Sequence, residues 1–336
     1  MQSLSIDRKL SNLPLAITMG EPGGINSEIF LKAINEINKI DHFIICDPSW
    51  IEKSIKFFNK KISINILDQN LNTKENYINV MPTKRNVIFK LGKPNKRNNR
   101  AIIESIDKAV YLAKNKKVSG IVTLPIYKKN LIEDGFKFPG HTEYLSYKDK
   151  SDSLMVLMNK KLKVATVTTH IPISKVSKSL NKSLIIKKIN ILHESLIKDF
   201  KINYPKIAIS SLNPHAGEEG RIGREEIEII IPALKYLRRN NINVIGPLPA
   251  DTLFNKDNLE EYDARLCMFH DQALIPIKTL DFFNGVNFTS GLSFIRTSPD
   301  HGTAFNISGK NMANPNSLIS SIKQAKIIAK NRQSYG

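Results

Sequence analysis

The chain has 336 residues, of which 41% are hydrophobic and 24% charged, the composition of an ordinary globular protein. No apolar run approaches the roughly 20 residues that a membrane-spanning helix needs, and the polar N-terminal segment lacks the apolar stretch of a secretory signal. The net charge of +19 would suit a polyanion, but the lysines are scattered over nearly every expected helix, so we expect no nucleic-acid partner and no membrane partner.

Strand-like and helix-like stretches alternate through the first part of the chain, which is typical of an α/β fold. We expect strands at 15–19, 42–46, 62–67 and 120–124, and helices at 26–38 and 101–114. Residues 68–100 are rich in Asn and irregular, with one short strand expected near 87–89. The chain length favours two α/β lobes over a single core.

The same alternation continues in the second part of the chain. We expect strands at 155–159, 164–169, 207–212, 243–246 and 266–269, with helices at 183–197 and 224–238. Cys46 and Cys267 both lie inside apolar runs, which predicts buried free thiols. Without a disulfide framework, we expect the protein in a reducing cytoplasm.

Three histidines, His170, His215 and His270, each follow a short apolar or β-prone run. In an open α/β sheet the residue just past a strand lines the crevice where ligands bind. Three imidazoles in such places can converge on one divalent metal and leave a position open for substrate. Each taken alone could instead be a capping or core histidine, but three in one kind of context, beside Asp271 and Glu218, favour a metal site.

The turn from Gly20 to Gly24 separates an expected strand from an expected helix. Its backbone amides could face an anion at the helix N-terminus, or the segment could be a plain connecting turn. The glycines do not have G-x-G-x-x-G spacing, and no acidic residue stands at the expected later strand end. A Rossmann nucleotide site is therefore not predicted here.

Two polar series could recognise an anion. His141 and Thr142 open an expected helix whose free amides could hold a phosphate, although a simple helix cap with an exposed histidine would look the same. Lys278, Asn287 and Arg296 combine a point charge with a bidentate fork, the mixture that phosphate and carboxylate recognition uses. Any one of these three alone would be read as a solvated surface residue.

The stretch from His301 to Pro315 contains Gly302, Gly309 and an Asn-Pro turn at Asn314. Glycines and such a turn indicate a backbone that wraps closely around something. The residue chemistry alone does not identify the ligand.

Together these motifs resemble the 4-hydroxythreonine-4-phosphate dehydrogenase family of pyridoxal phosphate biosynthesis. The resemblance runs in family order from about residue 14 to about residue 325. It rests on segments 20–25, 140–143, 213–218, 223–226, 246–252, 269–272, 294–298 and 300–304. The stretch from His301 to Pro315 is also similar to the adenosine-binding loop of isopropylmalate and isocitrate dehydrogenases.

The resemblance implies a fold of two α/β/α lobes with a central cleft, as in isopropylmalate dehydrogenase and unlike a Rossmann domain. Residues 1–130 with about 280–336 would form the first lobe, which carries the nucleotide loop. Residues from about 131 to 279 would form the second lobe, on the metal and dimer side. The family builds each active site from two subunits, which implies a homodimer with a shared site.

The resemblance also implies the reaction. NAD or NADP and a divalent metal (zinc, cobalt or magnesium) would support oxidation of 4-phosphooxy-L-threonine to 2-amino-3-oxo-4-phosphooxybutanoate, with the metal polarising the substrate hydroxyl. That product would decarboxylate to 3-amino-2-oxopropyl phosphate in pyridoxine 5'-phosphate biosynthesis. Imidazole ligands favour zinc or cobalt over magnesium. A sister group that oxidises phosphothreonate or phosphoerythronate shares these residues, so that alternative stays open.

The family's functional positions match residues of this chain as follows. Metal ligands match His170, His215 and His270; substrate contacts match His141, Thr142, Lys278, Asn287 and Arg296; cofactor contacts match His301, Gly302, Thr303 and Asn314; catalytic groups match Asp251, Asp271 and Lys278.

The sequence departs from the family pattern in two loops. Asn26 and Ser27 stand where the family usually has Gly-Pro, and Tyr127 replaces a small polar residue or histidine. Neither departure touches the metal histidines. They leave open a change in substrate shape or turnover.

Overall fold

A computed structural model describes residues 9–256 and 259–335 of the chain. Its contacts divide the chain into two compact units, which we name unit 1 (Met1–Asp149 with Ser293–Gly336) and unit 2 (Lys150–Leu292). Residues 1–8, which the sequence assigns to the first lobe, lie outside the described residues. Unit 1 is therefore built from both ends of the chain, while unit 2 is one continuous segment.

Unit 1 is built around parallel strands in the order β3-β4-β2-β1-β5-β12. Their bounds are β1 Leu15–Thr18, β2 His42–Cys46, β3 Ser63–Ile66, β4 Tyr77–Pro82, β5 Gly120–Thr123 and β12 Arg296–Pro299. Strands β1, β2, β5 and β12 are buried along their whole length, as expected for parallel strands covered on both faces.

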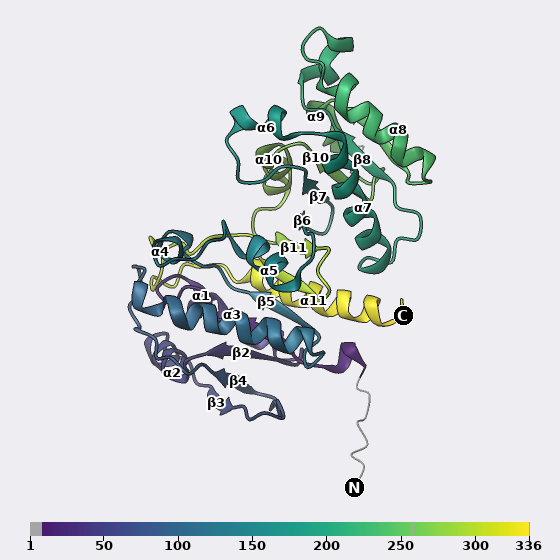
Figure 1. Ribbon diagram of the computed structural model, residues 1–336. Helices are drawn as coiled ribbons and strands as arrows, with labels where there is room; N and C mark the ends of the chain where they lie inside the picture. The colour runs from purple at the N-terminus through teal and green to yellow at the C-terminus, as the bar shows by residue number, and fades with distance from the viewer. Residues whose placement is uncertain (1–8, 257–258, 336) are drawn as a thin grey trace. The chain divides into compact units, whose positions relative to one another are not determined.

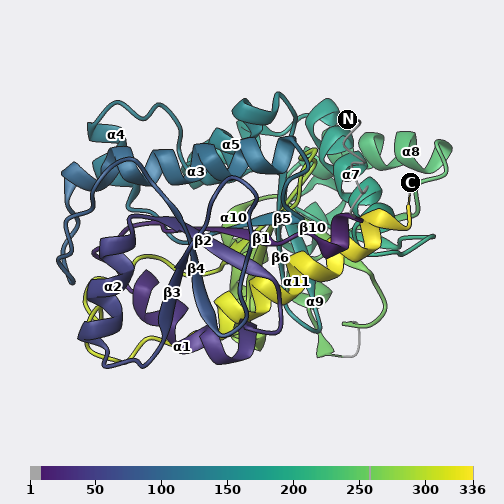
Figure 2. The same ribbon diagram turned by 90° about the horizontal axis from the view of Figure 1, so that it is seen from below.

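Helices cover both faces of the unit 1 sheet. Their bounds are α1 Asn26–Ile37, α2 Pro48–Phe57, α3 Asn99–Lys114, α4 Lys128–Glu133, α5 His141–Asp149 and α11 Asn316–Gln333, with short 3-10 turns η1 Leu10–Asn12 and η2 Lys96–Asn98. Helix α3 packs on β1, β2 and β5, and α11 packs on β12, β5 and α1. Figure 2 shows α3 on one face of this sheet and α1 with α11 on the other.

Unit 2 has a mixed sheet in the order β11-β6-β7-β10-β8-β9. Its strands are β6 Leu154–Met158, β7 Lys163–Thr166, β8 Ile207–Ser210, β9 Val244–Leu248, β10 Ala264–Cys267 and β11 Val286–Ser290. Strand β6 runs antiparallel to both neighbours, whereas β7, β10, β8 and β9 are parallel to one another. The carboxyl ends of β7, β10 and β8 therefore meet at one edge of the sheet.

The helices of unit 2 sandwich this sheet. They are α6 Ile173–Ser179, α7 Lys182–Lys198, α8 Ile231–Arg239, α9 Ala250–Leu253 and α10 His270–Leu280, with the 3-10 segment η3 Pro214–Gly220 and the π-helix η4 Glu226–Ile230. Helices α7 and α8 pack together on one side, and α10 lies on the other side of the strands (Figure 1). Ala273 and Ile277 of α10 join Met155, Val164 and Cys267 in a buried apolar cluster.

The predicted α/β class is confirmed, and most predicted elements form within one or two residues of their expected bounds. The strand expected near 87–89 is wrong: the strand of that region is β4, at Tyr77–Pro82. Backbone amides of the 87–89 segment donate hydrogen bonds to side chains and not to a neighbouring strand. The Val87 amide donates to Asp47 Oδ2 at 2.7 Å, and the Ile88 amide donates to Asn98 Oδ1 at 2.8 Å.

Both cysteines are buried and free, as predicted. In the part of the chain that the structure describes, no helix has the length and apolarity needed to cross a membrane.

Candidate functional site

The candidate metal ligands lie at one edge of the unit 2 sheet. His170 follows β7, His215 lies in η3 after β8, and His270 opens α10, separated from the end of β10 by two residues. Since β7, β10 and β8 are adjacent and parallel, their ends bring the histidine-bearing loops to one edge. His170 and His215 are exposed and His270 is half-buried, so their imidazoles are not core residues.

His170 and His270 form a close pair. Their ring centroids lie 5.6 Å apart. The Nδ1 of His270 lies 3.0 Å from Asp271 Oδ1, an arrangement that fixes the ring and leaves Nε2 for another ligand. Within residues 9–256 and 259–335, no group of three or more His, Cys, Asp or Glu comes together that could hold a metal ion. The pair thus fits two positions of an imidazole site, and His215 is not brought to it in this structure.

A chain of hydrogen bonds ties the three strand ends together. The Thr168 hydroxyl donates to the Met268 carbonyl at 2.7 Å. The Gln272 side chain accepts from the Met268 amide at 2.8 Å and donates to the Ser211 carbonyl at 2.8 Å. Because the backbone amide must donate and the carbonyl must accept, these partners also fix the orientation of the Gln272 amide. The histidine-bearing segments are thus coupled to one another.

The segment that carries His215 has a left-handed backbone. The φ angles are 51° at His215, 53° at Ala216, 79° at Gly217, 42° at Glu218 and 55° at Glu219. A left-handed residue other than glycine costs roughly 1–2 kcal/mol, so this turn needs support from its surroundings. We call His215–Glu219 the left-handed turn.

The other residues predicted for unit 2 occupy separate positions. Asp251 is exposed in the first turn of α9, and Lys278 is half-buried near the end of α10. Asn287 lies on β11 opposite Leu157, and its side-chain Oδ1 is among the described buried oxygens that accept no hydrogen bond.

In unit 1 a buried arginine is held at the end of β5. Arg296 is 3% exposed, and its Nε and Nη2 donate to the Thr123 hydroxyl at 3.0 and 2.7 Å. Gly140 directly precedes α5, and a Cβ placed on it would come within 3.2 Å of Lys128 Nζ and 3.4 Å of Glu143 Oε2. These side chains therefore close on the start of α5.

His141, the first residue of α5, belongs to the same positive environment. Burial, together with the charges of Arg296 and Lys128, lowers its pKa well below the usual value, so the imidazole is neutral at pH 7. Burial also lowers the pKa of Arg296 to about 10, against the opposing effect of Glu143, so the guanidinium stays charged. A charged guanidinium beside a neutral imidazole suits the binding of an anionic group.

The Gly20–Gly24 turn does not offer its amides to a ligand. The Gly23 amide donates to Glu21 Oε1 at 3.1 Å, the Gly24 amide to the Glu21 carbonyl at 3.2 Å, and the Ile25 amide to the Thr303 carbonyl at 3.1 Å. A Cβ at Gly23 would come within 2.1 Å of the Lys93 carbonyl, so the glycine serves a close backbone approach. Of the two interpretations of this turn, the structure supports the connecting turn.

The departures from the family pattern have local structural roles. Asn26 Nδ2 donates to three carbonyls, those of Met19 (3.2 Å), Glu21 (3.1 Å) and Pro125 (2.9 Å), and so holds the turn to the loop after β5. The Tyr127 ring packs edge-on against Phe305, with centroids 5.2 Å apart. For Ser27 the structure gives no explanation beyond its burial.

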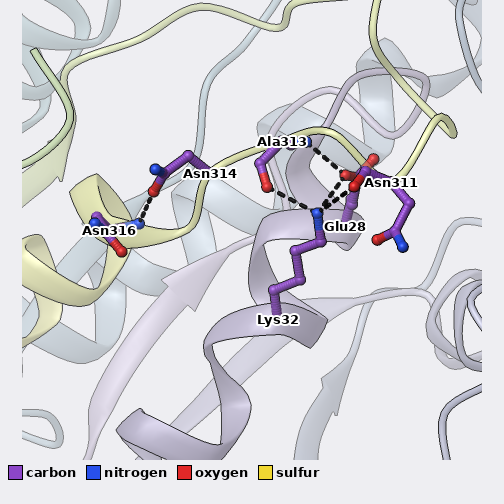
Figure 3. A network of polar contacts seen from close by, with 6 residues as sticks. All are labelled: Glu28, Lys32, Asn311, Ala313, Asn314 and Asn316. Carbon is purple, nitrogen blue, oxygen red and sulfur yellow. Dashed lines mark hydrogen bonds and ion pairs between the residues drawn. The ribbon is translucent and has the colours of Figure 1, made fainter.

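The stretch from Asp300 to Pro315 is anchored along α1 (Figure 3). Buried Glu28 accepts the Ala313 amide at 2.7 Å and binds Lys32 Nζ at 3.0 Å. Lys32 in turn donates to the carbonyls of Asn311 at 2.8 Å and Ala313 at 2.9 Å. Contacts from α1 therefore hold the end of this stretch in place.

Within this anchored stretch the predicted cofactor contacts differ in accessibility. Gly302 and Asn314 are exposed, and a Cβ at Gly302 would meet no heavy atom within 4 Å. The Asn314 Oδ1 accepts the Asn316 amide at 2.8 Å at the start of α11. Thr303 is buried and its carbonyl holds Ile25, whereas His301 Nδ1 lies 3.0 Å from the Gly302 carbonyl. Gly302 therefore presents open backbone.

Sequence reasoning missed Thr123, Lys128, Gln272 and Glu226 as residues of the candidate site. Thr123 is the last residue of β5, and the strand-end rule used for the histidines would have found it. Gln272 and Glu226 act through hydrogen bonds to distant backbone, for which the sequence carries no signal.

The sequence matches the family described as pyridoxal phosphate biosynthetic protein PdxA over residues 38–325. It is 41% identical to a 4-hydroxythreonine-4-phosphate dehydrogenase of Sulfurihydrogenibium sp. (strain YO3AOP1) over 322 residues, which cover 95% of this chain and 99% of the relative. A relative of the same name from Zymomonas mobilis is 40% identical, covering 96% of this chain and 97% of its own.

Solved structures agree. The 4-hydroxythreonine-4-phosphate dehydrogenase of Klebsiella pneumoniae matches with a TM-score of 0.85 and 35% identity, over 94% of this chain and 98% of that one. A beta-decarboxylating dehydrogenase of Thermococcus kodakarensis matches with a TM-score of 0.50 and 10% identity, over 96% of this chain and 85% of that one. The second likeness shows the fold alone, and it agrees with the predicted isopropylmalate dehydrogenase-like fold.

Proposed function

The chain belongs to the family of the pyridoxal phosphate biosynthetic protein PdxA, and on that premise we propose that it is a 4-hydroxythreonine-4-phosphate dehydrogenase. It oxidises the hydroxyl of 4-phosphooxy-L-threonine to give 2-amino-3-oxo-4-phosphooxybutanoate, with NAD or NADP as the hydride acceptor. The oxo acid then loses carbon dioxide to give 3-amino-2-oxopropyl phosphate. The observation that carries the proposal is the set of histidine-bearing loops at adjacent parallel strand ends, with two rings 5.6 Å apart.

His170, His215 and His270 would hold a divalent metal, with zinc or cobalt favoured over magnesium by imidazole ligands. When bound, such a metal acts as a Lewis acid toward the substrate hydroxyl. The His170–His270 pair and the Asp271 contact to His270 Nδ1 support the assignment. For His215 the support is its position at the end of the neighbouring strand β8.

His141, Thr142, Lys278, Asn287 and Arg296 bind the substrate in this proposal. The charged, buried guanidinium of Arg296 supports recognition of a phosphate or carboxylate. The buried Oδ1 of Asn287, which accepts no hydrogen bond within the described chain, supports a role in receiving a substrate donor. A neutral His141 can donate or accept one hydrogen bond without repelling the neighbouring guanidinium.

The dinucleotide lies along His301, Gly302, Thr303 and Asn314 in this proposal, and not on the Gly20–Gly24 turn. When bound, its nicotinamide accepts the hydride. Open space at Gly302 supports a close approach of the ligand to the backbone, and the anchoring by Glu28 and Lys32 supports a preformed site.

Proton transfer is assigned to Asp251, Asp271 and Lys278. Asp271 accepts from His270 in the geometry of a group that orients a ligand. Asp251 is exposed on α9 and Lys278 is half-buried on α10, so neither side chain is enclosed in the core, which is compatible with a role as proton acceptor or donor.

The active enzyme is proposed to be a cytoplasmic homodimer with shared sites. Exposed apolar side chains at Ile275, Phe282 and Phe283 of unit 2 support a protein contact there. Two buried free thiols support a reducing compartment. Sedimentation equilibrium that gives a monomer mass at working concentrations would contradict the dimer.

Turnover of synthetic substrates tests the function directly. We expect the protein to reduce the dinucleotide when 4-phosphooxy-L-threonine is supplied. The rate of this reduction should fall to background after metal depletion and recover when zinc or cobalt is added. A phosphoerythronate control run with each dinucleotide distinguishes the sister activity. Faster turnover of phosphoerythronate than of phosphooxythreonine would replace the proposed substrate.

A further inference from the structure

A buried carboxylate from a neighbouring helix holds the base of the left-handed turn. Glu226 is 1% exposed. Its Oε1 accepts the backbone amides of Leu212 and Asn213, each at 2.8 Å, and its Oε2 accepts Asn213 Nδ2 at 2.8 Å. Both oxygens of this carboxylate are therefore occupied by the segment that leads from β8 into His215.

The turn itself is packed against the same carboxylate. A Cβ placed on Gly217, where φ is 79°, would come within 2.8 Å of Glu226 Oε2. The turn closes through the Ile222 amide, which donates to the Gly217 carbonyl at 3.1 Å. Glu226 thus contacts the left-handed turn at its base and near its middle.

The Asn213 side chain is enclosed from a second side. Its Nδ2 also donates to Glu225 Oε2 at 2.8 Å, and Glu225 Oε1 accepts the Ser177 hydroxyl at 2.5 Å. A Cβ at Gly223 would come within 2.3 Å of Asn213 Nδ2, so any larger residue there would displace the Asn213 side chain. The residue that leads into His215 is therefore fixed by several partners.

Glu226 also occupies an unusual backbone element. It is the first residue of the π-helix η4, which precedes α8. Such wide turns are rare and often lie at functional sites, because the extra residue displaces one side chain from the regular helical direction. Here the element starts with the side chain that binds the loop after β8.

We propose that Glu226 is a positioning residue: it maintains the left-handed turn and thereby directs the His215 imidazole. The proposal rests on the proposed role of His215 as a metal ligand. A carboxylate suits this task because three donors converge on it, from Leu212, from the Asn213 backbone and from the Asn213 side chain. A glutamine of the same size would turn its own NH₂ group toward at least one of those donors.

The main test compares Glu226→Gln with Glu228→Gln in the full-length protein. Glu228 is a matched control because it lies in the same π-helix, is exposed, and pairs only with Arg224 among the contacts that the structure gives. Three quantities are measured: hydrogen exchange of the amides of residues 211–220, the rate of His215 modification by diethylpyrocarbonate, and the affinity of the metal-depleted protein for Co²⁺.

We expect Glu226→Gln to raise exchange of the Leu212 and Asn213 amides about tenfold, because its NH₂ group replaces one of the two accepting oxygens, faces a donor and weakens the hold of this side chain on the segment. The His215 modification rate should change, and Co²⁺ affinity should fall about tenfold to a hundredfold, the range typical when a group that orients ligands is lost. Glu228→Gln should match the unaltered protein in all three measurements. Unchanged values for Glu226→Gln would overturn the proposal.

A partial result is also decisive. Faster exchange with unchanged His215 reactivity and unchanged Co²⁺ affinity would show that Glu226 supports the loop without directing the imidazole, and the proposal would fail. If Glu226→Gln does not fold, Gly217→Ala disturbs the same contact from the loop side and should produce the same three changes.

A His215→Ala protein separates this proposal from the proposed function. If that variant binds Co²⁺ as tightly as the unaltered protein, His215 is not a ligand and that part of the proposed function fails. Exchange of residues 211–220 and reactivity of His215 would still decide whether Glu226 positions the imidazole.

Discussion

Two loops that follow parallel strands are held by opposite kinds of contact. The Gly20–Gly24 turn after β1 is buried, and internal acceptors take its amides. The left-handed turn after β8 is exposed over most of its length, and an outside carboxylate, Glu226, binds the segment leading into it. The first loop carries structure, and the second presents a side chain.

The carboxylates of the two loops differ in the same way. Glu226 uses both oxygens as acceptors. Glu21 accepts the Gly23 amide with Oε1, whereas its buried Oε2 has no hydrogen-bond partner within the described chain. Burial raises the pKa of Glu21 to about 7, and backbone N–H groups of Gly23 and Asn95 only partly offset this effect. A buried carboxylate with one oxygen that accepts no hydrogen bond within the described chain thus has a pKa near neutrality.

The largest expected effect is functional and lies in the exposed loop. His215→Ala should reduce turnover by at least about a thousandfold and weaken metal binding, because it removes one of the proposed ligands. The imidazole is exposed, so the free energy of unfolding should change by less than about 1 kcal/mol. Steady-state rates and urea unfolding of the metal-depleted protein measure both quantities. Normal activity in metal-depleted buffer would refute the histidine site.

In the buried Gly20–Gly24 turn, the expected effect is on the free energy of unfolding and its dependence on pH. The folded pKa of Glu21 is about 7 against an ordinary 4.5, so its protonated form favours folding. That contribution is complete below about pH 4.5 and is lost as the pH rises through 7, an effect of about 3 kcal/mol. Glu21→Gln, which imitates the protonated group, should remove this decline. Urea unfolding between pH 5 and pH 8 checks it; parallel curves for both proteins would contradict it.

Two cations proposed to bind the same substrate allow a sharper comparison. Arg296→Ala and Lys278→Ala should each raise the KM for the phosphorylated substrate about tenfold to a hundredfold, since each removes a charge-assisted bond of roughly 1.5–3 kcal/mol. Arg296 is buried on Thr123 and Lys278 is half-buried, so Arg296→Ala should lower the free energy of unfolding more than Lys278→Ala does. If the KM for the dinucleotide rises instead, these residues bind the other ligand.

The smallest expected effect concerns the one exposed glycine of the proposed nucleotide loop. Gly302→Val should weaken NAD binding by roughly tenfold through steric exclusion, while metal affinity stays the same. The protein itself has room for the new side chain, because nothing lies within 4 Å of a Cβ at this position. Calorimetric titration with NAD and with Co²⁺ measures both. Unchanged NAD affinity would move the dinucleotide away from this loop.

The sequence predicted the site-bearing loops of unit 2 more closely than those of unit 1. In unit 2, apolar runs located β7, β8 and β10 closely enough to identify each following histidine. In unit 1 the sequence did not decide whether the Gly20–Gly24 turn binds an anion or only connects two elements. The decision depends on which atoms accept the backbone amides, and these acceptors belong to Glu21 and Thr303. Sequence reasoning misplaced the strand of residues 68–100, because Asp47 and Asn98 side chains satisfy a backbone that looks β-prone.

The sequence by itself determined the α/β class, the family and the candidate residues, because alternation of apolar runs and motif order are properties of neighbouring residues. Tertiary structure alone decided how those residues are held. Thr123 lies 173 positions from Arg296, and Glu226 lies 14 positions from Leu212. No local pattern records such pairs, since a hydrogen bond depends on where the folded backbone brings donor and acceptor. The two glycines Gly302 and Gly23 differ for the same reason. A Cβ at Gly302 would meet open space and a Cβ at Gly23 would meet the Lys93 carbonyl, because the folded backbone brings a neighbour to only one of them.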